Sequence, residues 1–211
     1  MKKLFLIPLT CFLLACETTY YSAMEQVGVH KRDILVDRVQ EGRESQLDAQ
    51  KQFRSALEQF KSVVDFDGGN LEKRYNKLNK EFEASEDSAE EIHERVDGIE
   101  SVAKALFKEW KSELAEYSSA SLRRQSQEQL NATQRQYDQL ISAMRSAEAK
   151  LDPVLDAMRD QVLFLKHNLN ASAIKSLKGE VVTINRDVDR LLAAMEEAIS
   201  EADKFISQMK S

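Results

Sequence analysis

The chain has 211 residues, with 30 lysines and arginines against 36 aspartates and glutamates and a formal net charge of −6. This acidic balance excludes a general nucleic-acid-binding protein, because such proteins need a basic face for the phosphates. Only two prolines and six glycines interrupt a composition that is 31% charged, which argues against a loop-rich domain and favours long, solvated helices.

The first 15 residues have the pattern of a secretory signal. Lys2 and Lys3 precede a short apolar run that ends at Ala15. A basic start, an apolar core and a small residue before the cut are typical of a cleaved leader. The run is too short for a transmembrane helix, which needs about 20 apolar residues. We therefore expect residues 1–15 to be removed and residues 16–211 to form one elongated helical domain.

The end of this leader, Leu13-Leu14-Ala15-Cys16, resembles the lipobox of bacterial lipoproteins, in which the cysteine is acylated and begins the mature chain. The alternative is an ordinary signal peptide with a cysteine there by chance. Two or more acyl chains hold a protein firmly on a bilayer. The next residue is Glu17 rather than the aspartate that commonly retains lipoproteins in the inner membrane. We therefore expect lipidation at Cys16 on the periplasmic face of the outer membrane, with the inner membrane less favoured.

Loss of the leader changes two properties of the chain. It removes two lysines and no acid, so the formal charge falls from −6 to −8. It also removes Cys11, the only cysteine besides Cys16. The mature chain therefore has no pair of cysteines for an internal disulfide, and its stability must come from packing.

Two runs of apolar residues at heptad spacing fill the first half of the domain. The first run lies within residues 20–66 and ends at Gly68-Gly69, which predicts a turn. Asn70 is a predicted N-cap for the second run, which stays in register over residues 71–117. Ser88 and Glu91 resemble a capping box and leave a break near residues 82–92 open, but the unbroken phase favours one continuous helix.

Two further runs fill the second half. Residues 118–129 are almost entirely polar, which predicts a turn near 118–121. The third run covers residues 122–168 and contains Pro153 after Asp152, which predicts a kink or a short restart of the helix. Asn168 and Asn170 predict the next turn, and the fourth run covers residues 171–210.

The four predicted helices have nearly equal lengths and short connections, which favours antiparallel neighbours. We expect an all-α fold, an elongated antiparallel four-helix bundle or coiled-coil rod. If the first helix leaves the membrane at Cys16, the Gly68-Gly69 turn is far from the bilayer and the turn at 118–121 lies back beside it. Arg123 and Arg124 would then contact anionic headgroups, each contributing about 1 kcal/mol.

Two segments carry a resemblance to a known family: Ser118-Ser-Ala-Ser-Leu-Arg-Arg-Gln-Ser126 and the stretch from Asp152 to Glu180. In these segments, and over nearly all of the mature chain, the protein resembles a family of helical proteobacterial lipoproteins of unknown function. Members are sometimes labelled DNA repair ATPases. The resemblance implies a lipoprotein with a helical fold, and it supplies no catalytic residues.

No catalytic residue, cofactor or metal site is predicted. An ATPase needs a glycine-rich phosphate loop followed by lysine and serine or threonine, whereas Gly68-Gly69 is followed by Asn-Leu-Glu. Glu90 and His93 form one Glu-x-x-His unit, which di-iron bundles use twice. A second copy is missing, so we interpret His93 as part of a solvated helix face. Trp110 lies at a heptad position, which favours core packing over a docking patch.

The densest apolar stretch of the mature chain is Val162-Leu163-Phe164-Leu165. Four consecutive apolar residues point around most of a helix, which exceeds the needs of a single packing seam. A central helix of the bundle explains the stretch most simply. The alternative is an exposed face or groove for a partner or a ligand. Any specific interaction is predicted at these four residues.

The favoured function is that of a non-enzymatic, lipid-tethered helical protein with a structural, scaffold or adaptor role in the cell envelope. Its partners would be the membrane, through the acyl chains, and an envelope protein or a second copy of the chain. The alternative is a binding module for a lipid or another envelope ligand held between helices. An enzyme is the least favoured class, because no set of catalytic side chains can be assembled economically.

Overall fold

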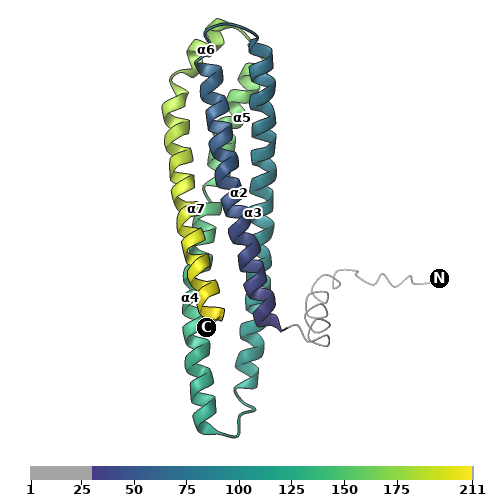
Figure 1. Ribbon diagram of the computed structural model, residues 1–211, viewed down its shortest axis with the longest axis vertical. Helices are drawn as coiled ribbons and strands as arrows, with labels where there is room; N and C mark the ends of the chain where they lie inside the picture. Colours follow the sequence, from purple (N-terminus) through teal and green to yellow (C-terminus); the bar gives the residue numbers. More distant parts are fainter. Residues whose placement is uncertain (1–29, 211) are drawn as a thin grey trace, which may run out of the picture.

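The computed structural model describes residues 30–210, and within this part of the chain it contains helices and no strand. The helices are α2 (Lys31–Val64), α3 (Leu71–Glu113), α4 (Ala120–Glu148), α5 (Leu151–His167), α6 (Ala171–Leu177) and α7 (Glu180–Lys210). Figure 1 shows that the long helices lie side by side in an elongated bundle. The predicted all-α bundle is confirmed. The leader, Cys16 and the predicted start of the first helix at residue 20 lie outside the described residues.

The bundle has four columns, one of which is made of two helices. Helix α2 packs along α3 and α7, and α4 packs along α7 and α3. Helix α5 continues in the direction of α4 and packs against α3 and α7 toward the opposite end of the bundle (Figure 1). Helices α2 and α3 are neighbours in the chain and join through a tight turn, whereas the packing of α7 on α2 and α4 brings together segments that are distant in the sequence.

The turn between α2 and α3 has the chemistry that the sequence predicted. Gly68 and Gly69 have φ angles of +143° and +105°, which L side chains rarely adopt. The side chain of Asn70 then accepts a hydrogen bond of 2.9 Å from the backbone N–H of Lys73 and so caps α3. The two glycines reverse the chain, and Asn70 fixes where the next helix begins.

Helix α3 is continuous from Leu71 to Glu113, as the heptad phase predicted. Ser88 does not begin a new helix: its hydroxyl donates to the carbonyl oxygen of Ala84, one turn earlier. With 43 residues, α3 is about 65 Å long and is the longest element among the described residues. It therefore sets the length of the rod.

The third predicted helix, 122–168, is interrupted at Ala149-Lys150 rather than at Pro153 itself. Pro153 lies in the first turn of α5, where its missing N–H leaves no hydrogen bond unmade. In an uninterrupted helix its ring would clash with the carbonyl of Ala149, four residues earlier. Lys150 occupies the N-cap position without a side-chain cap, and Asp152 lies in the first turn of the helix.

The fourth predicted helix, 171–210, is also divided. Helix α6 is capped by Asn170, whose side chain accepts from the N–H of Ala173 at 3.0 Å, and ends at Leu177. After Lys178-Gly179 the chain turns into α7. Glycine is a poor helix former, and the change of direction lets α6 lie across the end of the bundle (Figure 1). Ile174 and Leu177 of α6 are buried there, so α6 covers the end of the core.

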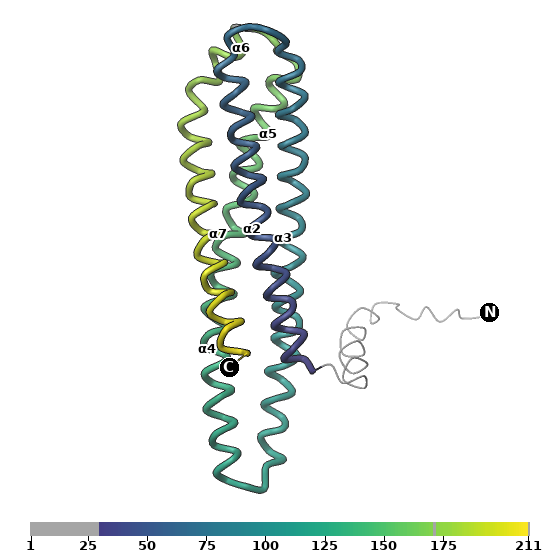
Figure 2. Tube along the Cα trace, viewed as in Figure 1, coloured from purple at the N-terminus to yellow at the C-terminus, as the bar shows by residue number. Residues whose placement is uncertain are grey.

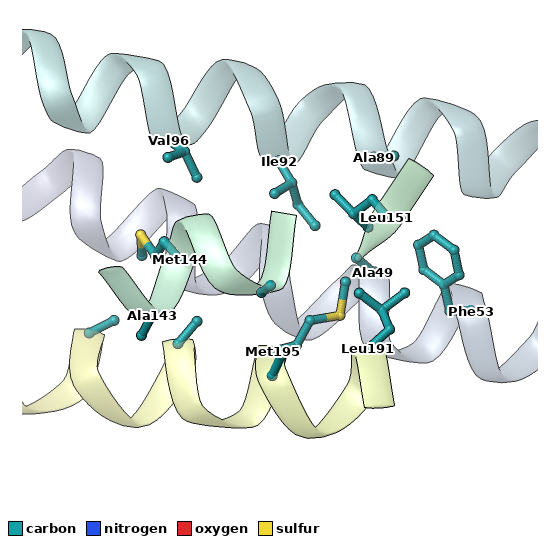
Figure 3. Close-up of a cluster of buried hydrophobic side chains, with 14 of the residues drawn as sticks. Ala49, Phe53, Ala89, Ile92, Val96, Ala143, Met144, Leu151, Leu191 and Met195 are labelled. Atoms are coloured by element: carbon teal, nitrogen blue, oxygen red, sulfur yellow. The ribbon is translucent and has the colours of Figure 1, made fainter. Parts of the chain in front are cut away.

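The core runs through the bundle without interruption, including the place where α4 gives way to α5. Figure 3 shows Met144 of α4 and Leu151 of α5 among buried side chains from α2, α3 and α7. Full burial of such a side chain contributes about 1.5–3 kcal/mol. The largest side chains that are completely enclosed are spread over the columns: Phe53, Phe60, Leu78, Ile92, Ile99, Leu140, Met144, Leu165 and Phe205.

Helices α2 and α7 end at the same level of the bundle, and α3 and α4 continue beyond them (Figure 2). Lys31, at the start of α2, lies 3.1 Å from the carboxylate of Glu109 on α3. Arg32 donates to the carbonyl oxygen of Met209 near the end of α7. The α3–α4 hairpin past this level, residues 110–126, is called the arm below. One end of the molecule is thus a four-helix bundle and the other is a two-helix arm.

Candidate interaction surfaces at the two ends of the bundle

The predicted segment Val162–Leu165 is divided between the core and the surface. Val162 and Leu165 are buried, whereas the side chains of Leu163 and Phe164 are 50% and 39% exposed. Val162 and Leu165 point inward because they follow the apolar stripe of α5, and the two residues between them point outward. The core explanation is therefore right for Val162 and Leu165, and an interaction at Leu163 and Phe164 stays a prediction.

Large exposed apolar side chains gather at the two ends of the molecule. Among the described residues, six are exposed, and none of them lies on the flanks of the long helices: Tyr117, Leu122, Leu163, Phe164, Leu169 and Val182. Tyr117 and Leu122 lie in the arm. The other four lie where α5 ends, in the connection to α6, and at the start of α7, which Figure 1 shows together at the opposite end.

The end opposite the arm also carries exposed lysines. We call the following group the far-end surface: Leu163, Phe164, Lys166, Leu169, Lys175, Lys178 and Val182, all of them exposed. The helix ends hold this group in place. The side chain of Asn168 donates to the carbonyl oxygen of Phe164 at 2.9 Å and closes the last turn of α5, and Asn170 begins α6 two residues later.

A signal in the sequence could have identified the far-end surface, and heptad analysis missed it. Residues 161–179 contain Lys166, Lys175, Lys178 and His167 but no aspartate or glutamate, in a chain with 36 acids. This is the longest acid-free stretch of the sequence. Outside the leader, the next longest is residues 117–127, which include Arg123 and Arg124. The two acid-free stretches contain all of the exposed large apolar side chains except Val182, which follows Glu180.

The flanks of the bundle are acidic in contrast. An open groove of about 640 Å³ between α4 and α7 is lined by small residues of α4 together with Asp138, Glu197 and Glu201. A smaller groove between α2 and α3, about 150 Å³, is lined mainly by the carboxylates of Glu41, Glu44, Asp48 and Glu91. Each groove also contains one basic side chain, Lys204 in the first and Arg95 in the second, so carboxylates outnumber basic groups in both.

A polar contact joins the two helices of the arm near its base. The indole N–H of Trp110 on α3 donates to the hydroxyl of Ser126 on α4 at 2.8 Å. The predicted core position of Trp110 is thus only partly right, because the ring packs on the core and is half-buried. Arg123 and Arg124 are exposed in the first turn of α4, next to Leu122. Ser119 caps this helix through the N–H of Leu122.

A third cavity lies where the arm begins, and we call it the step groove. Its volume is about 740 Å³. It exists because α2 and α7 end at this level while α3 and α4 continue. Leu106, Trp110 and Met209 supply apolar surface, and the complete lining is Arg32, Leu106, Glu109, Trp110, Glu113, Gln129, Thr133, Gln208 and Met209.

His93 is not simply a solvated residue, and that prediction is wrong. Its Nδ1 lies 2.5 Å from a carboxylate oxygen of Glu148 on α4, and its side chain is two-thirds buried. Arg145 donates to both oxygens of the same carboxylate, and also to Glu100 and Asp97 on α3. The hydrogen bond to Glu100 is the main cause that raises the pKa of the Arg145 guanidinium above its ordinary value.

This cluster ties α3 to the last turn of α4, just before the break at Ala149-Lys150. Its groups are fully engaged with one another, which is typical of a structural ion-pair network. Within residues 30–210, no cluster of three or more histidine, cysteine, aspartate or glutamate side chains has the arrangement to hold a metal ion. The ion-pair cluster thus holds α4 against α3 at the place where α4 ends and α5 begins.

One ionisable side chain near the base of the arm is strongly perturbed. The ring of Tyr137 packs edge-to-face on Phe107, with ring centres 5.4 Å apart. Burial raises the pKa of the Tyr137 phenol to about 12, and the nearby carboxylate of Glu100 adds to the effect. The hydroxyl therefore stays neutral, as its packing between α3 and α4 requires.

These features define a class of protein: an all-α rod with carboxylate-rich grooves on its flanks and with exposed apolar and basic side chains at its two ends. A family model described as "Protein of unknown function (DUF2959)" matches residues 20–209, nearly the whole chain. The chain belongs to this family. A comparison with curated proteins finds no match. Among the described residues, none of the helices combines the length and apolar character needed to cross a membrane.

Proposed function

We propose that this protein is a lipid-anchored, non-catalytic rod of the cell envelope, which holds an interaction surface at a fixed distance from the bilayer. In this proposal the lipobox-like sequence ending at Cys16 supplies the anchor, on the periplasmic face of the outer membrane. The bundle is the spacer, and the far-end surface is the part that meets a partner. Membership of a family of unknown function is compatible with such a role.

The observation that carries this proposal is the placement of two features at opposite ends. Helix α2, which follows the leader and its short connecting segment, begins at the level of the arm, as the contact between Lys31 and Glu109 fixes. The far-end surface lies at the other end of the bundle (Figure 1). Since α3 alone is about 65 Å long, an anchor attached ahead of α2 would keep the far-end surface well away from the anchoring bilayer.

The arm has its own part in this arrangement. It extends past the start of α2, so its tip would be the part of the folded domain nearest to the anchored lipid. Arg123 and Arg124 are exposed there beside Leu122, which suits contact with anionic headgroups and the apolar layer below them. Such a contact would hold the rod upright rather than flat, because its acidic flanks are repelled by an anionic surface.

Fractionation of cells tests the anchor. We expect the wild-type protein in the outer-membrane fraction and the Cys16→Ser variant in the soluble periplasmic fraction. Globomycin, which blocks processing of prolipoproteins, should cause the wild type to accumulate with its leader attached. A Cys11→Ser variant is the matched control and should behave like the wild type. If Cys16→Ser remained with the membranes to the same extent, the proposed anchor would be wrong.

In-cell crosslinking tests the role as scaffold or adaptor. A photoreactive residue at Leu163 should give reproducible crosslinks to an envelope component or to a second copy of the chain. The same residue at Asp87, which is exposed on the flank of α3, is the matched control. Equal crosslinking from both positions, or none from Leu163, would contradict an interaction surface at the far end.

The step groove supports a second candidate function, that of a binding module for a single lipid. Its volume of about 740 Å³ and the apolar faces of Leu106, Trp110 and Met209 suit part of an acyl chain. This location differs from the predicted one, because Leu163 and Phe164 point to solvent at the other end. Native mass spectrometry of the detergent-extracted protein would detect a co-purifying lipid, and a Trp110→Ala variant should lose it.

A further inference from the structure

We propose that the far-end surface binds an anionic phospholipid bilayer, so that the protein bridges its anchoring membrane to a second membrane surface. This inference rests on the proposed function, since it names the partner of the spacer. The surface combines Leu163, Phe164 and Val182 with Lys166, Lys175 and Lys178, and all of them are exposed. Apolar side chains beside lysines are the elements with which peripheral proteins bind the interface of anionic membranes.

Charge complementarity is the first argument for this partner. The three lysines lie in residues 161–179, which contain no carboxylate, although the mature chain has a net charge of −8. The exposed acids at the same end belong to other segments: Asp65 and Asp67 to the connection between α2 and α3, and Glu180 to the start of α7. Each lysine close to an anionic membrane strengthens binding about fivefold. Three lysines acting together would account for about a hundredfold preference for anionic over zwitterionic lipid.

The residue types favour a lipid surface over a protein partner. Protein interfaces are enriched in aromatic residues, methionine and arginine and depleted in lysine. The far-end surface has three lysines and only one residue of the enriched types, Phe164. Val182 is 73% exposed and Leu163 50%, so both project from the end of the bundle and can enter an interface without a change in the fold.

The acidic flanks determine how such a membrane would be approached. The carboxylates of Asp138, Glu197 and Glu201 line one side of the bundle, and another acidic groove lies between α2 and α3. These groups disfavour a rod lying flat on an anionic bilayer, because like charges repel over about 10 Å at moderate salt. Contact through an end is therefore preferred. When the arm lies at the anchoring membrane, the far-end surface at the opposite end of the bundle faces a second membrane.

A vesicle-bridging experiment tests the inference. The mature chain with Cys16→Ser would carry an N-terminal histidine tag and be tethered to phosphatidylcholine vesicles through a nickel-chelating lipid. A second population of labelled vesicles, with or without phosphatidylglycerol, is then added, and clustering is measured by energy transfer. We expect clustering with the phosphatidylglycerol vesicles and at least about a hundredfold weaker clustering for the Lys166→Glu/Lys175→Glu/Lys178→Glu variant.

Three matched variants make the result specific. Lys51→Glu/Lys80→Glu/Lys104→Glu changes the charge equally on exposed flank positions and should cluster the vesicles like the tethered parent chain. Arg123→Glu/Arg124→Glu alters the arm, which faces the tethering vesicle, and should also have no effect. Leu163→Ser/Val182→Ser should weaken clustering about tenfold through lost apolar contact. Circular dichroism of each variant confirms that the helices are intact.

The inference is overturned if the parent chain clusters phosphatidylglycerol vesicles no better than phosphatidylcholine vesicles. It is also overturned if reversal of the flank lysines or of the arm arginines reduces clustering as much as reversal of the far-end lysines. Capture of an acidic protein by Leu163 in cells, combined with absent vesicle binding, would assign the surface to a protein partner instead. The tag replaces the acyl anchor, so failure of lipidation at Cys16 would leave this outcome unaffected.

Discussion

Gly42 of α2 lies directly against Ile99 of α3: a Cβ atom built on Gly42 would be 2.9 Å from the Cδ1 atom of Ile99. Real Cβ atoms do not approach other atoms so closely, and Ile99 is completely buried, so it has little room to move. The glycine thus allows α2 and α3 to approach each other in the middle of the bundle. Gly98, one residue before Ile99 on α3, faces open space.

The two glycines predict opposite effects on stability. Gly98→Ala should raise the free energy of unfolding by about 0.5–1 kcal/mol, since alanine is the better helix former and meets no neighbour. Gly42→Ala gains the same propensity but forces Ile99 out of its position, so we expect a net loss of about 1–2 kcal/mol. Urea denaturation followed by circular dichroism measures both. Equal stabilisation by the two substitutions would contradict the close contact.

Arg145 is predicted to matter more than any solvent-exposed ion pair. Arg145→Met removes the hydrogen bonds to Asp97, Glu100 and Glu148 and leaves the carboxylate of Glu148, which is only 11% exposed, without its cationic partner. We expect a loss of about 1–2 kcal/mol. Lys51→Met is the control, since its pair with Asp48 is fully surface-exposed and contributes about 0–0.5 kcal/mol. Thermal unfolding at low and high salt compares the two.

Tyr137 predicts a loss of stability in alkali. An unfolded tyrosine loses its proton near pH 10, whereas burial raises the pKa of folded Tyr137 to about 12. Between these values the unfolded chain holds fewer protons than the folded one, so stability falls as the pH rises. Tyr137→Phe should be less sensitive over this range. Spectrophotometric titration follows the absorbance of tyrosinate in the wild type and in Tyr137→Phe. The wild type should show one additional titration step near pH 12, which the variant lacks.

The orientation of the anchored protein can be measured with single cysteines. If Cys16 is lipidated as proposed, its sulfur is blocked by the lipid, so Leu122→Cys or Val182→Cys supplies the only free thiol of the processed chain for a fluorophore. With a quencher on the lipid headgroups, we expect strong quenching at position 122 in the arm and little at position 182, which lies at the opposite end of the molecule. Stronger quenching at position 182 would reverse the proposed orientation, and equal quenching would indicate a rod lying flat.

Much of the fold could be predicted because its signals are local. Heptad spacing located the long helices, and the uninterrupted phase through Ser88 correctly favoured a single α3. Gly68-Gly69 and Asn70 marked the first turn because their backbone and capping preferences act within a few residues. Two breaks were placed less well. Pro153 acts on the carbonyl four residues earlier, so the break falls at Ala149-Lys150, and the turn at Lys178-Gly179 that divides α6 from α7 was not predicted.

The surfaces were harder to predict than the helices. Periodicity identified Val162 to Leu165 as unusual but could not divide the inward-facing residues from the outward-facing ones without the position of α5 between α3 and α7. His93 was assigned to solvent because its partner, Glu148, is distant in sequence. The step groove also depends on helix lengths that are set by packing: α2 and α7 end where α3 and α4 continue.

The contact between Arg32 and Met209 has a consequence for engineering. The first and last described helices end beside each other, so a short linker could join residues 31 and 210, and new termini could be opened at Gly68-Gly69, where the glycines make no close contact. Such a circular permutant should retain the same bundle. If the lipobox were placed ahead of residue 70, the far-end surface would be the end nearest to the anchoring membrane. This permutant and the original chain have the same length but opposite orientations. A comparison of the two in cells would therefore show whether function depends on which end faces the membrane.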